Sequence, residues 1–334
     1  MSNTIIDNSF FRLENLTKVF YINTNKGLKS TPVTAVKNVS FNIKRGEIFG
    51  LVGESGCGKS TLAKIALRLI EASSGAAYYE GRDLYQMKYR ELVAVRRDLQ
   101  VVFQDPYDSL NPRLSLEELV AEPLKIHKYG NKAKRRDRIA ELFQNVGLPT
   151  QLMTRYPHQL SGGQRQRLCI ARSLAVSPRF LVCDEAVSAL DVSIQAQILN
   201  LLLDLKESFG LTYLFISHNL SVVKFVSDRI GVMYFGRLVE LAETKTLFSG
   251  VLHPYTHALL SALPVPDPDK KRKQALLKGG VPSLFDPPSG CIFHNRCPYK
   301  KEVCMNEEPP FIDMGNQHYA ACHFAGELDL NNNL

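Results

Sequence analysis

Hydrophobic and polar residues alternate along the first part of the chain. Between residues 10 and 45, short alternating runs such as FFRLENLTKVFYI and VTAVKNVSFNI are typical of antiparallel strands at one edge of a sheet. The pattern changes at residues 47–53, where EIFGLVG is typical of a buried strand that enters a glycine-rich turn. Residues 59–71 then carry apolar side chains at helical spacing. The pattern therefore predicts a strand, a glycine loop and a helix in succession.

Apolar runs farther along the chain predict a mainly parallel sheet. The runs at residues 99–105, 180–185 and 212–218 are short and continuous, as expected for strands buried on both faces. Segments with helical periodicity separate them, at about 116–127, 133–146, 162–176 and 194–208. These helices carry enough apolar residues to cover the sheet or to pack as a helical subdomain, over about residues 105–176. The predicted fold class is α/β.

The composition changes after residue 264. The sequences PVPDPDKKRKQ and GGVPSLFDPPSG are rich in proline and glycine and resemble a linker. A chain of 334 residues is long enough for one full domain with an appendage. We therefore place a domain at residues 1–263 and an extension at residues 264–334, and a tail that folds back and docks is the alternative.

Charge and hydropathy restrict the setting in which the protein works. No apolar run approaches the roughly 20 residues needed to cross a bilayer, and the N-terminal sequence has no export-signal pattern. These features predict a cytosolic chain. The net charge of +8 is compatible with nucleic acid, lipid or a phosphorylated ligand. The basic runs at 132–138 and 270–273 have no interleaved aromatic residues for base stacking, so a solvated surface is the simpler interpretation.

The glycine loop fits the phosphate-binding pattern G-x-x-x-x-G-K-[ST]. Its glycines let backbone N–H groups face phosphate oxygens, and the following helix adds the positive end of its dipole. Lys59 is expected to reach the β- and γ-phosphates of ATP, and Ser60 to hold Mg²⁺. The predicted nucleotide contacts in this segment are Gly53, Glu54, Ser55, Gly56, Cys57, Gly58, Lys59, Ser60 and Thr61.

Two further segments complete a predicted ATP site. The strand RFLVCDE ends in an acid pair, in which Asp184 would support the Mg²⁺ ion and Glu185 would orient and polarise the attacking water. The sequence LSGGQRQR begins a helix with Ser161 at the capping position, and its glycines leave backbone N–H groups accessible to a second anion. If the two anion sites lie at different ends of the molecule, one chain cannot bind the same triphosphate with both. Two chains in a head-to-tail pair could do so, each chain completing the other's site.

Together these residues resemble the ATP-binding cassette of ABC transporters, over about residues 10 to 260. The resemblance implies a RecA-like core with an antiparallel β edge and a helical subdomain. It implies that Gln104 contacts Mg²⁺, that His218 contacts the γ-phosphate, and that Phe20, with Tyr21 as the alternative, stacks on adenine. The signature sequence includes Ser161, Gly162, Gly163 and Gln164, and Ser188 to Asp191 resembles the D-loop that communicates across the dimer. One departure is Ala186, where the family usually has proline.

Longer segments resemble one branch of that family, the ATPase subunits of dipeptide and oligopeptide importers. They are QDPYDSLNPRLSLEELVAEPL, RYPHQLSGGQRQR, SALDVSIQAQILNLL and HPYTHALLSALPVPDP. The resemblance implies a second ATP-binding subunit, identical or paralogous, and two separate membrane permease subunits. It also implies an extracellular binding protein that delivers peptide, and a peripheral position at the cytoplasmic face of the cell membrane. Residues 107–112 would contact the permeases, and nickel or another small solute is the alternative cargo.

Four of the seven cysteines lie in the extension, at Cys291, Cys297, Cys304 and Cys322. Disulfides are disfavoured by the predicted cytosolic setting, and the spacing lacks the short C-x2-C pairs typical of structural zinc. Four thiolates suit an iron–sulfur cluster, and the branch resemblance also implies [4Fe–4S], with Zn²⁺ as the alternative. His294, His318 and His323 are candidate substitute ligands. Ligation would give this short tail a fold.

Two other functional classes are possible from the sequence. One is a soluble cassette ATPase that acts on nucleic acid, which the basic charge permits, although such proteins usually carry two cassettes or a coiled-coil insertion. The other is a redox protein in which the cysteine cluster performs the main chemistry. We expect the transporter function, with no nucleic acid partner.

Overall fold

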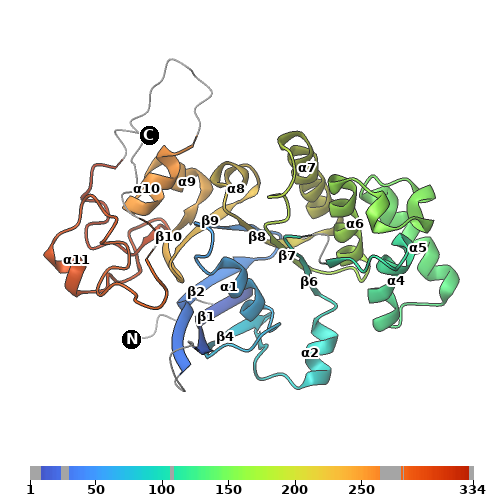
Figure 1. Ribbon diagram of the computed structural model, residues 1–334, viewed down its shortest axis with the longest axis horizontal. Coiled ribbons are helices and arrows are strands. Elements are labelled where there is room, and N and C mark those ends of the chain that lie inside the picture. Colours follow the sequence, from blue (N-terminus) through green and yellow to red (C-terminus); the bar gives the residue numbers. More distant parts are fainter. Residues whose placement is uncertain (1–8, 24–29, 106–108, 264–279, 281, 331–334) are drawn as a thin grey trace, which may run out of the picture. The chain divides into compact units, whose positions relative to one another are not determined.

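A computed structural model describes residues 9–23, 30–105, 109–263, 280 and 282–330. The chain divides into two compact units. The first contains Met1–Asn42, Phe49–Tyr85 and Ser217–Leu334, and the second contains Ile43–Ile48 and Gln86–Ile216. Figure 1 labels most elements of each unit, and the units are described in turn.

The first unit contains the predicted antiparallel sheet. The strand order is β2-β1-β4-β5. Side chains alternate in β2, where Val39 and Phe41 are buried while Asn38 and Ser40 are exposed, because successive residues point to opposite faces of a strand. The strands are β1 (Ser9–Asn23), β2 (Ser30–Lys44), β4 (Ser74–Tyr79) and β5 (Arg82–Asp83).

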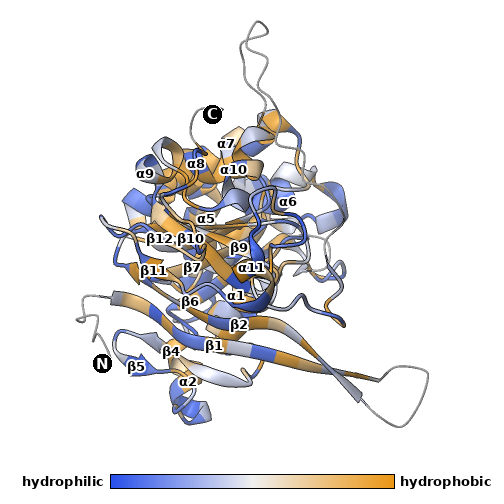
Figure 2. Cartoon of the chain, turned by 90° about the vertical axis from the view of Figure 1, so that its left-hand side faces the viewer, coloured by the Kyte–Doolittle hydropathy of each residue, from blue (hydrophilic) through white to orange (hydrophobic). Residues whose placement is uncertain are grey.

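A second group of strands in the first unit includes the deeply buried strands β3, β9 and β10. Its order is β11-β12-β10-β9-β3, with β3 parallel to β9 and the remaining pairs antiparallel. Figure 2 shows β9 and β10 mainly in the colour of hydrophobic residues, in agreement with their burial. The strands are β3 (Ile48–Val52), β9 (Arg229–Tyr234), β10 (Arg237–Glu243), β11 (Ile312–Asp313) and β12 (Tyr319–Ala320).

The helix that follows the glycine loop is shorter than the sequence pattern predicts. Helix α1 (Lys59–Ala66) ends before residue 71 because Arg68 has a left-handed backbone, with φ of 48°. The Arg68 guanidinium donates to the Leu84 carbonyl at 2.7 Å, which fixes this departure from the helix. The other helices of the first unit are α8 (Leu220–Val226), α9 (Thr244–Ser249), α10 (Pro254–Ser261) and α11 (Glu302–Asn306).

The second unit contains the predicted parallel strands, in the order β8-β7-β6. All residues of β7 and β8 are buried, which explains their continuous apolar runs. Helices α4, α5 and α6 pack against one another. The strands are β6 (Leu99–Val102), β7 (Phe180–Asp184) and β8 (Thr212–Ser217), and the helices are α2 (Tyr89–Val95), α4 (Leu116–Ile126), α5 (Lys132–Asn145), α6 (Gly162–Leu174) and α7 (Val192–Phe209), with 3-10 turns at Thr150–Thr154 and Pro157–Gln159.

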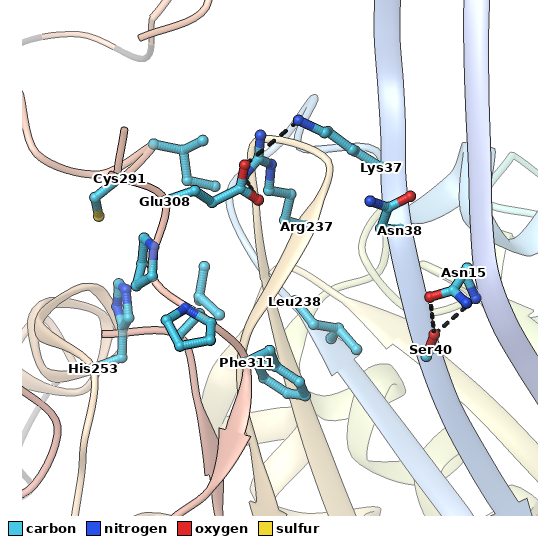
Figure 3. A pocket seen from close by; sticks show the side chains of 15 residues that line it. Asn15, Lys37, Asn38, Ser40, Arg237, Leu238, His253, Cys291, Glu308 and Phe311 are labelled. Atoms are coloured by element: carbon cyan, nitrogen blue, oxygen red, sulfur yellow. Dashed lines mark hydrogen bonds and ion pairs between the residues drawn. The ribbon is translucent and has the colours of Figure 1, made fainter. Parts of the chain in front are cut away.

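The cysteine-rich extension docks on the strands of the first unit. Its strand β12 pairs with β10, so that Ala320 lies opposite Glu240. Glu308 forms ion pairs with Lys37 at 3.5 Å and with Arg237 (Figure 3). The extension therefore folds back and docks, which was the alternative prediction for this segment. The linker-like residues 264–279 lie outside the described residues.

Candidate functional site

The phosphate loop connects β3 to α1 in a backbone path that requires glycine. Gly58, the residue before α1, has φ of 104°, and a Cβ added there would lie 2.4 Å from the Ala35 carbonyl oxygen. Gly56 has φ of 78°, but a Cβ there would meet nothing within 4 Å. Since Gly58 carries no side chain that could cap the helix, the first turn of α1 presents backbone N–H groups to an anion.

Replacing Gly58 with Ala is expected to destabilise the protein more than replacing Gly56 with Ala. Both variants place a side chain at positive φ, but only Gly58→Ala adds a clash with backbone, worth about 1–3 kcal/mol. Urea unfolding of the two variants measures the difference, with Gly56→Ala as the matched control. Equal unfolding free energies would show that the loop relaxes around Gly58.

Backbone carbonyls of the phosphate loop bind the Lys59 side chain. Lys59 is 3% exposed. The ammonium donates to the carbonyl oxygens of Gly53 at 2.8 Å and Glu54 at 3.0 Å. Ser60 and Thr61 follow in the first turn of α1. Burial raises the pKa of the Cys57 thiol, so this side chain is a neutral packing group in the loop.

The loop also has two contacts that no sequence pattern predicts. The Glu54 backbone N–H donates to the Tyr255 hydroxyl at 2.9 Å. The guanidinium of Arg296 donates to both carboxylate oxygens of Glu54, at 2.7 and 3.0 Å. Tyr255 and Arg296 lie more than 200 positions away in the sequence, and no local pattern singles them out.

The acid pair lies at the carboxyl end of β7. Asp184 is 5% exposed and Glu185 is 8% exposed, and Glu185 has a left-handed backbone with φ of 49°. The Gln104 side-chain amide donates to a Glu185 carboxylate oxygen at 3.1 Å. The Glu185 N–H donates to the Ile216 carbonyl at 2.9 Å, and Ser188 donates to the Glu185 carbonyl. The structure thus places Gln104 against Glu185 and fixes the orientation of this carboxylate.

Ser161 caps α6 as the sequence predicts. Its hydroxyl accepts from the Gln164 N–H at 3.3 Å, and the Gln164 side chain accepts from the Ser161 N–H at 3.0 Å. Gly162 and Gly163 begin the helix. A Cβ at Gly163 would lie 2.6 Å from a methyl carbon of Ile194 in α7, so glycine is required for the two helices to pack.

Asp191 has a structural contact in addition to its predicted role at a dimer interface. It caps α7, where its carboxylate accepts from the Ile194 N–H at 3.0 Å. This hydrogen bond, with that from Ser193, holds the pKa of Asp191 below its usual value. Asp directly before a segment with helical periodicity is a sequence signal for a helix cap, which the resemblance to the D-loop does not include.

The remaining predicted nucleotide contacts are exposed. His218 follows the last residue of β8 and precedes the Asn219 cap of α8. Phe20, near the end of β1, is 38% exposed, and the Lys18 ammonium lies 5.0 Å from its ring centroid. Tyr21 is 72% exposed. Both aromatic rings are therefore accessible for stacking.

The extension brings its cysteines around one small cavity. All four sulfur-bearing side chains line it, together with His294, His323 and Phe293 among other residues. Burial raises the pKa of Cys297 to about 12 and that of Cys322 to about 11, so these groups are neutral thiols unless a cation binds them. Cys291 and Cys304 are buried, and the Cys291 N–H donates to the Cys304 carbonyl at 2.8 Å.

The three histidines considered as substitute ligands have other partners. His318 Nε2 contacts a Glu240 carboxylate oxygen at 2.7 Å, in a buried pair. His294 Nδ1 contacts the Cys291 carbonyl at 2.8 Å, and His323 Nε2 contacts the Glu307 carbonyl at 3.0 Å. Within the ranges that the structure describes, no group of three or more His, Cys, Asp or Glu side chains is placed to hold a metal ion.

Two family models match the chain. The ABC transporter model matches residues 36–188. The model of the C-terminal region of oligopeptide/dipeptide transporters matches residues 239–304.

Curated relatives match over nearly the full length. The putative oligopeptide transport ATP-binding protein YkfD of Bacillus subtilis is 50% identical over 298 residues, which cover 88% of this chain and 91% of YkfD. A probable peptide ABC transporter ATP-binding protein of Sinorhizobium fredii is 47% identical over 319 residues, which cover 95% of this chain and 90% of the relative.

Solved structures share the fold. A dimeric structure of the ATP-binding cassette MJ0796, bound to ADP and Pi in a post-hydrolysis state, aligns with a TM-score of 0.63 at 32% identity, over 70% of this chain and 98% of that chain. CbiO1 of Clostridium perfringens, part of an ABC transporter complex, aligns with a TM-score of 0.62 at 26% identity, over 72% of this chain and 91% of that chain. The chain therefore has the ABC cassette fold. With both family models matched and a relative at 50% identity, the chain belongs to the ABC transporter ATP-binding proteins, in the oligopeptide and dipeptide transporter group.

Proposed function

We propose that the protein is the ATP-hydrolysing subunit of an ABC importer that takes up dipeptides or oligopeptides. The observation that carries this proposal is the coexistence of a phosphate loop over buried Lys59 with a Glu185 carboxylate that Gln104 orients. The relatives' names and the matched C-terminal region support peptide as the cargo, in preference to nickel or nucleic acid.

The residues have distinct roles in ATP hydrolysis. Loop N–H groups and Lys59 bind the phosphates, as a helix N-terminus with an adjacent cation does in other phosphate sites. Ser60, Gln104 and Asp184 would hold Mg²⁺, which neutralises the charge that develops on the transferred phosphoryl group. Glu185 orients and polarises the attacking water.

A histidine and an aromatic side chain would complete the contacts with ATP. His218 would meet the γ-phosphate, and Phe20 or Tyr21 would stack on adenine through their exposed rings. These assignments rest on the family resemblance and on the exposure of the rings.

We propose that two cassettes bind ATP between them, head to tail. The glycines and capped Ser161 at the start of α6 form the second anion site, which would contact the γ-phosphate bound to the other cassette's phosphate loop. ATP then bridges the cassettes, and hydrolysis removes the bridge, so the nucleotide shifts the population between closed and open dimers. MJ0796, solved as a dimer, is a precedent among the matched structures.

The partners would be a second ATP-binding subunit, two membrane permease subunits and, indirectly, an extracellular peptide-binding protein. Among the described residues, no helix is long and apolar enough to cross a membrane. We place the protein at the cytoplasmic face of the cell membrane. The expected permease contact spans residues 107–112, of which 107 and 108 lie outside the described residues. The division at residues 263 and 264, with a helical subdomain near 105–176, is part of the same proposal.

Purification tests the cellular partners. The tagged chain, isolated with mild detergent, is expected to bring membrane permease subunits with it. Recovery with RNA or DNA in place of membrane subunits would contradict the transport function.

We also propose that the cysteine cavity holds a [4Fe–4S] cluster. Four thiols converge on one cavity, which fits the Cys₄ ligand set of such clusters. A cluster of several irons spaces its thiolates farther apart than a single ion does, with Zn–S bonds of about 2.3 Å. Zn²⁺ is the alternative ion, and among the described residues no group of three or more His, Cys, Asp or Glu side chains is placed to hold a metal ion. The cluster would stabilise the fold of the extension.

Replacing Cys297 with Ser is expected to remove or strongly reduce visible absorbance near ~400 nm that the cluster would give. Cys169→Ser is the matched control, because Cys169 lies in α6, outside the cavity. Absorption spectra with iron, sulfide and zinc analysis of anaerobically purified protein make the measurement. Colourless wild-type protein that contains zinc would contradict the cluster.

A further inference from the structure

A contact between the extension and the phosphate loop has no role in the ABC mechanism described above. The Arg296 guanidinium donates through its two terminal nitrogens to the two Glu54 carboxylate oxygens, at 2.7 and 3.0 Å. The Arg296 side chain is only 7% exposed and that of Glu54 is 24% exposed. A two-point contact of this kind fixes the orientation of both groups, and burial reduces its screening by solvent.

A cluster of aromatic side chains packs beside the Arg296–Glu54 pair. The Arg296 guanidinium lies 5.8 Å from the ring centroid of Tyr234. Tyr234 contacts Tyr255 at 4.6 Å and Phe293 at 5.3 Å between ring centroids. Arginine stays protonated in proteins, so both of its contacts with Glu54 are made by a cation. The extension therefore presents a fixed positive charge to the loop.

Glu54 connects this contact to the phosphate-binding lysine. Its carboxylate pairs with Arg296, its N–H donates to the Tyr255 hydroxyl, and its carbonyl accepts from the Lys59 ammonium at 3.0 Å. Glu54 is thus bound by residues that follow in the sequence, Arg296 of the extension among them, and its carbonyl binds Lys59. A shift of Glu54 would move a ligand of Lys59.

We propose that Arg296 is a positioning residue for ATP binding: through Glu54 it fixes the phosphate loop and neutralises a carboxylate that would otherwise repel the triphosphate. The proposal rests on the proposed function, since it requires that this loop binds ATP. It also gives the cysteine-rich extension a role in nucleotide affinity. Arg296 immediately precedes Cys297, which lines the cysteine cavity. A change in the conformation of the residues around that cavity would therefore move Arg296.

The expected effect is on affinity and not on the chemical step. The carboxylate repels ground-state ATP and the transition state to similar extents, because both carry the phosphates in the same loop. Loss of Arg296 should therefore raise the Kd and KM for ATP and leave kcat nearly unchanged.

The test compares variants of the full chain in its complete assembly, with ATP as the ligand. Arg296→Met is expected to weaken ATP binding about tenfold, with kcat within about twofold of wild type. Arg296→Lys keeps the charge without the two-point geometry and should restore part of the affinity. Lys300→Met is the matched control, since it removes an exposed cation from the same segment and should leave the Kd unchanged.

A double variant separates charge compensation from general damage to the fold. Glu54→Gln combined with Arg296→Met leaves no unpaired carboxylate, so the double variant should bind ATP more tightly than Arg296→Met alone. Unchanged Kd in Arg296→Met, or no gain in the double variant, would overturn the proposal. If Arg296→Met does not fold, Arg296→Lys is compared with wild type: a weaker affinity for ATP supports the proposal, and an unchanged Kd overturns it. Wild-type protein that fails to bind ATP would instead contradict the proposed function.

Discussion

Replacing Glu185 with Gln is expected to lower ATP turnover by about 10³-fold while ATP binding is retained. Gln has nearly the same shape and still offers an oxygen to the Gln104 amide, which now contacts the Glu185 carboxylate at 3.1 Å. The substitution therefore removes the negative charge and the proton acceptor with little change in geometry. Single-turnover hydrolysis of bound ATP measures the loss directly.

The Glu185→Gln variant should also remain in the closed dimer when ATP is present. Hydrolysis is the step that removes the bridge between the cassettes, so the ATP-bound population accumulates when it is blocked. Size-exclusion chromatography with ATP measures the dimer fraction. Glu207→Gln, an exposed substitution in α7, is the matched control and should behave as wild type. Undiminished turnover in Glu185→Gln would remove Glu185 from its catalytic role.

Replacing Lys59 with Met is expected to weaken ATP binding by about 10²-fold or more. The ammonium is the buried cation of the loop, held by the carbonyls of Gly53 and Glu54, and these contacts set its position for the phosphates. Met approximates the length of the side chain, so the change removes charge and hydrogen bonds more than packing. Isothermal titration with ATP and Mg²⁺ measures the affinity.

The control for this substitution lies in the same helix. Lys64 is exposed in α1, and Lys64→Met removes one positive charge without touching the loop carbonyls. Its affinity for ATP should match wild type. Equal loss in the two variants would indicate a general charge effect, and would contradict a specific role for Lys59.

Local sequence patterns predicted the parts of the fold that short segments determine. Apolar runs marked β3, β7 and β8 because buried parallel strands need apolar residues on both faces. Capping residues predicted the starts of helices, as Ser161 does for α6. The glycines of the phosphate loop were recognisable by their spacing, and the positive φ at Gly56 and Gly58 explains why glycine occupies these positions.

Long-range contacts were beyond the sequence patterns. The pairing of β12 with β10 and the contact of Arg296 with Glu54 join segments far apart in the chain, and their residues have no distinctive spacing. The end of α1 was predicted too late, because the apolar spacing continues past Ala66 while Arg68 adopts a left-handed backbone. Tertiary contacts decided the outcome in each case, and periodicity does not report such contacts.

The cysteines of the extension could be predicted in part from the sequence, while their surroundings depend on long-range contacts. The sequence grouped Cys291, Cys297, Cys304 and Cys322 by their position in the extension, and the structure places all four around one cavity. The sequence did not predict that two of them would be buried, nor that the neighbouring Arg296 would reach the phosphate loop. A ligand set can be proposed from spacing, but its surroundings depend on where the extension docks.

The most direct test of the account is the ATPase rate of the complete transporter, reconstituted in lipid vesicles with its peptide-binding protein. We expect the rate of ATP hydrolysis to increase when peptide is added. The same assembly with Glu185→Gln should not show this increase. Hydrolysis that is indifferent to peptide but increases with nucleic acid would contradict the proposed function.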